Sequence, residues 1–261
     1  MFYIFTHNDL DGYSANLISE FYKLKTKIVN VSNQNAEEEI LDFLIDREYY
    51  KYDFVFILDI LLSKECIEKI FDYSMNFVIL DHHNYNYVLN KKKYNSVYID
   101  TNECAASLFY KYLRINQIIK RNNLIERYIE GVRLFDTGKY LLTSTQNKAQ
   151  FMPEEINKVF AIYRENFPEH MTENFKMGYI LSREDKKIAK QLILNEEKYA
   201  VKKAKEMKFV KYKNYKIGIL FIDQITLLSD VYCYCSNIRR DVDIFVIINA
   251  FSNINIVFNR S

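Results

Sequence analysis

The chain has 261 residues, of which 49% are hydrophobic and 27% are charged, so its composition is that of a folded globular protein. Its 36 basic and 34 acidic residues leave a net charge of +2, which excludes a polycation that binds nucleic acid through overall charge alone. The four cysteines lack the spacing of a disulfide framework or a zinc cage, and no apolar run approaches the roughly 18 residues of a membrane span. Because residues 1–5 also lack the apolar core of a signal peptide, we expect a cytoplasmic protein that does not contact membranes.

The first half of the chain alternates short apolar segments with amphipathic ones. Segments rich in β-branched and aromatic residues predict buried strands at 2–5, 27–31, 54–58 and 77–80. Apolar residues at helical spacing predict helices at 11–22, 36–44 and 63–73. Because parallel strands need crossover connections, which helices usually provide, this alternation predicts an α/β fold with a parallel sheet.

The second half is first helical and then mixed. Helical spacing recurs at 103–113, 123–134 and, in a long polar segment, at 184–207. The two prolines, Pro153 and Pro168, predict a less regular region at 143–172. Further strands are predicted at 216–222, 244–249 and 253–258, with a helix at 227–238. We therefore expect an α/β domain at 1–145, a helical linker region at 146–207 and a smaller α/β domain at 208–261.

Acidic residues and histidines gather where the predicted strands end, which is where open α/β sheets bind ligands. The first strand is followed by His7, Asp9 and Asp11, the third by Asp59, and the fourth by Asp81, His82 and His83. Asp136 follows a predicted helix that can fold back over the same rim. Carboxylates mixed with imidazoles suit manganese, iron or zinc better than magnesium. This many donors would serve two ions that share a bridging carboxylate, the arrangement used in phosphoryl hydrolysis.

Each of these residues has a simpler explanation when it is taken alone. Asp11 would serve as the cap of the helix at 11–22, and His82 and His83 would serve as core histidines with satisfied hydrogen bonds. Three strand ends carrying such residues at once favour the metal site.

Four motifs, "THNDLDG", "ILDI", "LDHHN" and "LFDTG", resemble in order and spacing the motifs of the DHH phosphoesterase superfamily. Members carry a parallel α/β domain that binds two manganese ions and hydrolyse phosphodiester or phosphoanhydride bonds. The resemblance implies one ion on His7 and Asp9, a second on Asp11, His82 and Asp136, and Asp59 bridging both. It implies further that His83 faces the substrate phosphate and that Asp81 orients the histidines.

The spacing from His7 to Asp9 to Asp11 is similar to that of the short-oligonucleotide phosphodiesterases of the nanoRNase B type rather than to that of the family II pyrophosphatases. More weakly, "VDIFVIINAFSNINIVFNRS" resembles the strand pair of the small DHHA1 domain, which binds substrate. Among the candidate phosphate clamps, Arg133, Arg239, Arg240 and Arg260, this resemblance favours Arg260. The glycine-rich motif that follows the strand pair elsewhere does not occur before Ser261. Two explanations stay open, a longer native chain or a member that holds its substrate differently.

The resulting hypothesis is a manganese-dependent phosphodiesterase that hydrolyses short oligonucleotides or dinucleotides to mononucleotides by two-metal activation of water. A cyclic dinucleotide phosphodiesterase is one alternative, and a nucleotide-binding module without hydrolysis is another. Oligomeric state, cleavage polarity and the choice between RNA and DNA stay open.

Overall fold

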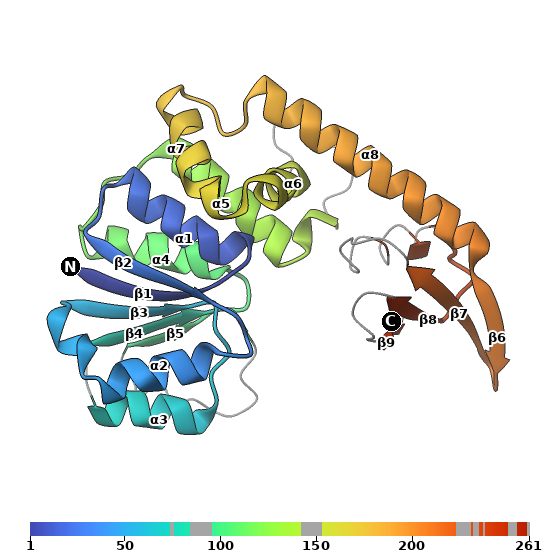
Figure 1. Cartoon of the computed structure of the whole chain (residues 1–261). Helices are drawn as coiled ribbons and strands as arrows, with labels where there is room; N and C mark the ends of the chain where they lie inside the picture. The colour runs from blue at the N-terminus through green and yellow to red at the C-terminus, as the bar shows by residue number, and fades with distance from the viewer. Residues whose placement is uncertain are drawn as a thin grey trace. The chain divides into compact units, whose positions relative to one another are not determined.

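The computed structural model describes residues 1–73, 76–83, 96–141, 153–222, 231, 235–236, 238–249 and 255–259. The chain divides into two compact units, Met1–Lys186 and Lys187–Ser261. Each unit contains one β-sheet with helix packed against it (Figure 1), so the predicted α/β fold class is confirmed.

Five parallel strands form the sheet of the first unit, in the order β2-β1-β3-β4-β5. They are β1 (Phe2–His7), β2 (Thr26–Val31), β3 (Phe54–Leu58), β4 (Phe77–Asp81) and β5 (Val97–Ile99). The first four confirm the predicted strands. The sequence did not reveal β5, because only Val97 of its three residues is buried and so short a segment carries too little pattern.

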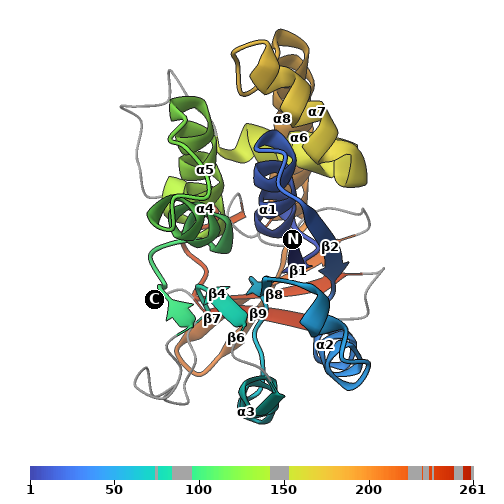
Figure 2. The same cartoon turned by 90° about the vertical axis from the view of Figure 1, so that its left-hand side faces the viewer.

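Helices cover both faces of this sheet. In Figures 1 and 2, α1 (Leu10–Phe21) and α4 (Ala105–Ile115) lie on one face, and α2 (Ala36–Ile45) and α3 (Lys64–Tyr73) lie on the other. The core beneath α2 and α3 joins Phe5, Ile57 and Ile79 of the strands to Ile40 and Ile67 of the helices. Because the central strands are buried on both faces, their sequences are continuous apolar runs rather than alternating ones.

Three more helices complete the first unit, α5 (Asn123–Asp136), α6 (Pro153–Tyr163) and α7 (Phe167–Lys176). They pack against α1 and one another. The expectation of a less regular region was wrong from residue 153 onward. Pro153 is the first residue of α6 and Pro168 lies in the first turn of α7, where a missing N–H removes no helical hydrogen bond. Short 3₁₀ turns lie at η1 (Glu48–Lys51), η2 (Lys139–Leu141) and η3 (Arg164–Asn166).

The helix α8 (Arg183–Glu206) begins in the first unit and continues into the second. Its first turn is fixed by a reciprocal cap, in which Ser182 Oγ accepts from the Asp185 N–H and Asp185 Oδ2 accepts from the Ser182 N–H. Asp185 Oδ1 lies 2.9 Å from His170 Nε2 of α7. None of the helices in the described residues has both the length and the apolar character needed to cross a membrane.

The second unit holds a four-stranded mixed sheet in the order β6-β7-β8-β9. The strands are β6 (Lys208–Tyr212), β7 (Tyr215–Ile222), β8 (Ile244–Asn249) and β9 (Asn255–Asn259). The central pair β7–β8 is parallel and the outer pairs are antiparallel. The sequence predicted three of these strands but not β6, whose five residues are all exposed. The predicted helix at 227–238 lies mostly outside the described residues.

Gly12 permits the tight turn from β1 into α1. A Cβ atom at this position would lie 1.8 Å from the carbonyl oxygen of His7 and 2.7 Å from its carbonyl carbon. No real Cβ contact is that short, so a larger residue would push the end of β1 away from α1. The Gly12 N–H also donates to Asp9 Oδ1 at 3.0 Å, and Asp9 is the N-cap of α1. This glycine therefore fixes the position of His7 and Asp9.

We expect Gly12→Ala to lower the free energy of unfolding by about 2–3 kcal/mol, because the clash involves backbone that has no space to relax. Gly178→Ala is the matched control. Gly178 has φ +85°, a backbone conformation that disfavours a side chain and that Gly12 does not share, but its Cβ would meet nothing within 4 Å. That change should cost only about 1 kcal/mol. Urea unfolding followed by circular dichroism measures both, and equal losses would show that no clash occurs at Gly12.

Candidate metal centre

The eight residues predicted to form a site lie at one edge of the first sheet. His7 ends β1, Asp81 ends β4, Asp59 directly follows β3, and Asp136 ends α5. They fall into three groups of donors, within each of which the atoms lie within 4.8 Å of one another. The groups overlap at Asp59 and His82, so all eight form one connected cluster: His7, Asp9 and Asp59; Asp11, His82 and Asp136; and Asp59, Asp81, His82 and His83.

The first group joins the ends of β1 and β3. His7 Nδ1 lies 2.8 Å from Asp9 Oδ2 and 3.8 Å from Asp59 Oδ2. The hydrogen bond with Asp9 is the largest cause that raises the pKa of His7 above its ordinary value, against the opposing effect of burial. Asp9 also caps α1 with its other oxygen, so both of its carboxylate oxygens are positioned.

The second group brings α5 to the same rim. His82 Nε2 lies 3.0 Å from Asp59 Oδ1 and 3.2 Å from Asp136 Oδ2. The Oδ2 atom of Asp136 is buried and accepts no hydrogen bond from the described residues. A buried carboxylate oxygen of this kind is costly unless a cation or a donor reaches it.

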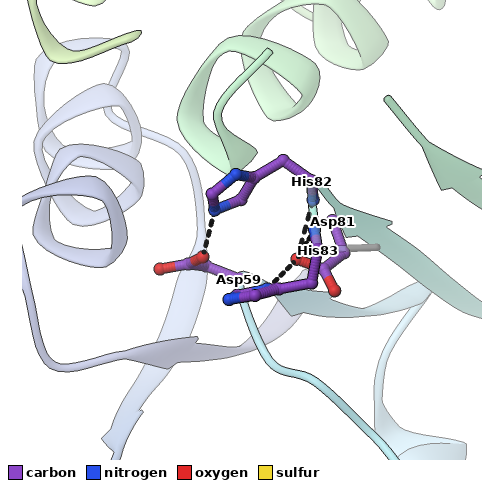
Figure 3. Close-up of side chains that lie close together, drawn as sticks. All are labelled: Asp59, Asp81, His82 and His83. Carbon is purple, nitrogen blue, oxygen red and sulfur yellow. Dashed lines mark hydrogen bonds and ion pairs between the residues drawn. The ribbon is translucent and has the colours of Figure 1, made fainter. Parts of the chain in front are cut away.

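Asp81 organises the two histidines that follow it. Its side chain is fully buried, and Oδ1 accepts from the N–H of His82 at 2.7 Å and lies 2.8 Å from Nδ1 of His83. Figure 3 shows the imidazole of His82 directed at Asp59 and the imidazole of His83 held beside Asp81. The hydrogen bond with Asp81 is the largest cause that raises the pKa of His83. The His83 side chain is 40% exposed, against 17% for His82, so His83 is the more accessible of the two.

Three carboxylates share this space without enough positive charge to balance them. Burial, followed by the charges of its neighbours, raises the pKa of Asp59 well above its ordinary value, and the same causes act on Asp11. Burial also raises the pKa of Asp136, to about 6. These shifts share one physical cause, which is negative charge collected where water does not screen it. A bound cation removes that cost.

Asp59 has an unusual backbone conformation, with φ +57°. This left-handed region is uncommon for residues with a side chain, although aspartate and asparagine adopt it more readily than most. Its N–H still donates to the carbonyl oxygen of Leu80 at 3.2 Å. The turn after β3 therefore aims the carboxylate at the rim and keeps the chain paired with β4, and strained residues of this kind concentrate at functional sites.

Metal ions fit this set of donors. Ligand bonds of about 2.1 Å at right angles place neighbouring donor atoms about 3 Å apart. The separations of His82 Nε2 from Asp59 Oδ1 and Asp136 Oδ2, 3.0 and 3.2 Å, agree with that spacing. A histidine nitrogen and carboxylate oxygens at such distances, with Asp136 Oδ2 lacking a hydrogen bond, suit an ion of the manganese, iron or zinc type.

Backbone groups that sequence reasoning missed hold Asp11 in place. Asp11 is buried, and its oxygens accept from the N–H groups of Ala105 at 2.6 Å and Ala106 at 2.9 Å, at the start of α4. Asp9, rather than Asp11, caps α1, so the simpler explanation of Asp11 as that cap is wrong. The sequence feature that could have revealed this contact is "CAAS" at 104–107. Small side chains at the start of a helix let a carboxylate approach the backbone N–H groups closely.

Of the predicted phosphate clamps, Arg133 belongs to the first unit, and Arg239 and Arg240 belong to the second. Arg260, the favoured one, lies outside the described residues. Arg133 donates to both carboxylate oxygens of Glu130 and to the carbonyl oxygen of Asn102. Arg239 pairs with Asp241 in the second unit.

Known structures share this fold at low sequence identity. An uncharacterised protein from Helicobacter pylori G27 is 18% identical, with a TM-score of 0.52 over 96% of this chain and 83% of the other. The pGpG-specific phosphodiesterase PggH from Vibrio cholerae is 13% identical, with a TM-score of 0.52 over 95% and 78%. The exonuclease RecJ bound to manganese is 9% identical, with a TM-score of 0.56 over 95% and 75%.

Sequence comparison supplies the family. The oligoribonuclease NrnB of Bacillus subtilis is 25% identical over 149 residues, which cover 54% of this chain and 37% of the relative. The match thus spans well under half of that protein. The N-terminal domain of the DHH family matches residues 1–133, the segment that carries every strand of the first sheet and seven of the eight clustered residues. Since that match extends over half of its length, the chain belongs to the DHH family.

Proposed function

We propose that this protein is a metal-dependent phosphodiesterase that hydrolyses short oligonucleotides to mononucleotides. The observation that carries the proposal is the shared position of Asp59 and His82, each of which belongs to two of the three donor groups. The group at His7, Asp9 and Asp59 and the group at Asp11, His82 and Asp136 share no residue, but Asp59 Oδ1 lies 3.0 Å from His82 Nε2, so Asp59 is positioned to serve both. This suits a pair of ions that share a ligand, which is the arrangement that phosphoryl transfer uses.

The substrate class is supported by the relative NrnB, whose name describes it as an oligoribonuclease. That relative is 25% identical and the match covers 37% of its length, so its activity enters here as part of the proposal. The spacing of His7, Asp9 and Asp11 in this chain supports the same class.

We assign one ion to His7 and Asp9, a second to Asp11, His82 and Asp136, and a bridging role to Asp59. When bound, such ions lower the pKa of water toward neutrality and neutralise phosphate charge. Manganese is the favoured ion, because imidazole and carboxylate ligands occur together and the donors are not all oxygen.

His83 and Asp81 contribute in a different way. Asp81 binds Nδ1 of His83 and thereby orients the ring and favours its protonated form. The remaining nitrogen, Nε2, is then a donor for a phosphate oxygen whose negative charge grows in the transition state. Asp81 is in this proposal a positioning residue for His83. Binding of the far end of the substrate by Arg260, within a substrate-binding domain at 208–261, remains a prediction.

A panel of labelled substrates tests the proposal. The protein is incubated with manganese and with linear RNA and DNA of two to ten nucleotides, next to cyclic dinucleotides, and the product lengths are measured. We expect mononucleotides from the linear substrates, no turnover in EDTA, and recovery when manganese is restored. Turnover of cyclic dinucleotides alone would replace the proposal with the cyclic alternative. Nucleotide binding without any turnover would identify a binding module.

Asp59→Asn should make the metal-free protein more stable and the enzyme inactive. Asparagine keeps the size of the side chain and tolerates the left-handed backbone, but it removes a buried charge that Asp11 and Asp136 repel. The variant should therefore melt at a higher temperature than the parent in EDTA. It should also lose the stabilisation that manganese gives the parent, which is about 2.7 kcal/mol at a hundredfold excess over the dissociation constant.

Asp72→Asn is the control, because Asp72 lies on the exposed side of α3. It should leave the melting temperature, the manganese response and turnover close to those of the parent. An Asp59→Asn protein that keeps activity within tenfold of the parent would contradict the bridging assignment.

His82→Asn and His83→Asn should separate metal binding from turnover. Loss of His82 should weaken manganese binding at least tenfold, because its Nε2 lies within 3.2 Å of both Asp59 and Asp136. Loss of His83 should leave manganese affinity within threefold while kcat falls by about 10²–10³, the usual loss when one transition-state donor is removed. Isothermal titration and steady-state kinetics measure the two effects. The control His170→Asn, in α7, should change neither, and equal loss of manganese in both variants would refute the division of roles.

A further inference from the structure

The hairpin formed by β6 and β7 is strongly basic and aromatic. Its sequence from residue 208 to 216, "KFVKYKNYK", contains four lysines and three aromatic residues but no acidic one. No acidic residue follows until Asp223. For a chain with a net charge of only +2, this segment is a local concentration of positive charge.

The sheet that the hairpin belongs to has one buried face and one open face. In β7, Gly218, Leu220 and Ile222 are buried, and they pack with Phe245 and Ile247 of β8 against the C-terminal part of α8. The residues between them point to the other face, where no helix of the described residues covers the strands. The open face carries Tyr215, Ile217, Ile219 and Phe221 of β7 and Lys208, Val210 and Tyr212 of β6.

Aromatic rings lie unusually exposed on this open face. Tyr212 and Tyr215 are direct cross-strand partners, and their side chains are 60% and 51% exposed. Phe221 is 52% exposed and lies on the same face about 20 Å further along β7, at about 3.3 Å per residue. Lys208 lies between them, with its Nζ 5.9 Å from the centre of the Phe221 ring. The open face therefore has stacking surfaces at both ends and a positive charge between them.

Among the described residues, one of the four hairpin lysines has an acidic partner and three do not. Lys216 is paired with Asp241 on the other side of the hairpin, and both Lys216 and Arg239 lie over the ring of Phe209. Lys208, Lys211 and Lys213 have no acidic partner among the described residues, and of these Lys208 lies on the open face and Lys213 in the turn beside it, whereas Lys211 points to the other face with Lys216. Lys213 Nζ lies 5.5 Å from the centre of the Tyr212 ring, so a positive charge also accompanies the tyrosine pair.

We propose that the open face of the β6–β7 hairpin binds single-stranded nucleic acid, with bases stacked on Tyr212, Tyr215 and Phe221 and phosphates beside Lys208 and Lys213. Exposed aromatic rings interleaved with lysine are what sequence-tolerant single-strand binding requires, because every base has a face to stack and every linkage a negative charge. The inference rests on the proposed function for its biological use, since it adds a second anchor for substrates longer than a dinucleotide. It is separate from the expected clamp at Arg260, because β9, the strand that precedes this residue in the sequence, lies at the edge of the sheet opposite to β6.

A second copy of this chain fits the face less well. Lysine on an edge strand opposes pairing of that edge with another, because it would bury charge between the copies. Both exposed ends of the face are aromatic rather than aliphatic, and each has a lysine near its ring. These features favour an anionic partner with flat rings.

The test measures binding of the full chain in EDTA, where no hydrolysis occurs. Fluorescence anisotropy with labelled single-stranded RNA of three and twelve nucleotides should give at least tenfold tighter binding of the longer strand. The double variant Tyr212→Ser with Tyr215→Ser should weaken binding of the 12-mer at least tenfold and leave the 3-mer within twofold. The matched control, Tyr50→Ser with Tyr179→Ser, removes two exposed tyrosines of the first unit and should change neither affinity.

The dependence of RNA affinity on salt concentration gives a second measurement. Lys208→Gln with Lys213→Gln should reduce the slope of log affinity against log salt by about 1.4 for the 12-mer, since each phosphate contact to a single strand contributes about 0.7. An unchanged affinity and slope in both hairpin variants would overturn the proposal. So would a change in oligomeric state of the tyrosine variant, seen by light scattering, without a change in RNA binding, because the face would then join copies of the chain.

The same experiments keep this inference distinct from the proposed function. Dinucleotide hydrolysis with manganese should continue in the hairpin variants, because the donor cluster lies in the first unit. If the parent hydrolyses linear oligonucleotides and the hairpin variants bind the 12-mer normally, only the hairpin inference fails. If the parent binds the 12-mer through the hairpin but hydrolyses nothing, only the enzymatic proposal fails.

Discussion

Asp11, Asp59 and Asp136 carry negative charge into one buried space, and the surrounding structure serves to hold them there against their mutual repulsion. The parallel strands bring these carboxylates close together, because the carboxyl ends of the strands meet at a single edge of the sheet. The amides of Ala105 and Ala106 offset part of it at Asp11, and His82 lies between Asp59 and Asp136. In the proposed metal centre, bound ions would neutralise the rest of the charge, and the cost of assembling these carboxylates would then be a source of affinity for metal.

The backbone accepts unfavourable conformations to keep these side chains in place. Gly12 lets α1 approach the carbonyl of His7 more closely than any side chain would permit. Asp59 adopts a left-handed conformation immediately after a buried strand. The dense apolar packing of β1, β3 and β4 supplies the stability that such local costs require. The apolar side chains within the strands thus provide stability, and the charged side chains at the strand ends form the donor cluster.

Much of this arrangement was predictable from sequence because it depends on local patterns. The strands β1 to β4 are continuous apolar runs, and histidines and aspartates lie at the ends of β1, β3 and β4, so both the sheet and the edge at which these side chains cluster could be located. The short strand β5 and the exposed strand β6 were missed, since three residues or five exposed ones give little hydrophobic signal. The amides of Ala105 and Ala106 were missed for another reason. Backbone groups bind Asp11 from 94 residues away in the chain, and no spacing rule encodes such a contact.

The order of the donors along the chain has a consequence for how the protein is made. His7, Asp9 and Asp11 leave the ribosome first, Asp59 and the two histidines follow, and Asp136 arrives last, at the end of α5. The early donors are too few to hold an ion firmly, because a preformed site does not exist in an unfolded chain. On the proposed ligand assignment, tight metal binding therefore requires that α5 has been synthesised and has packed against α1. A nascent chain interrupted before residue 136 would lack a ligand of the second proposed ion.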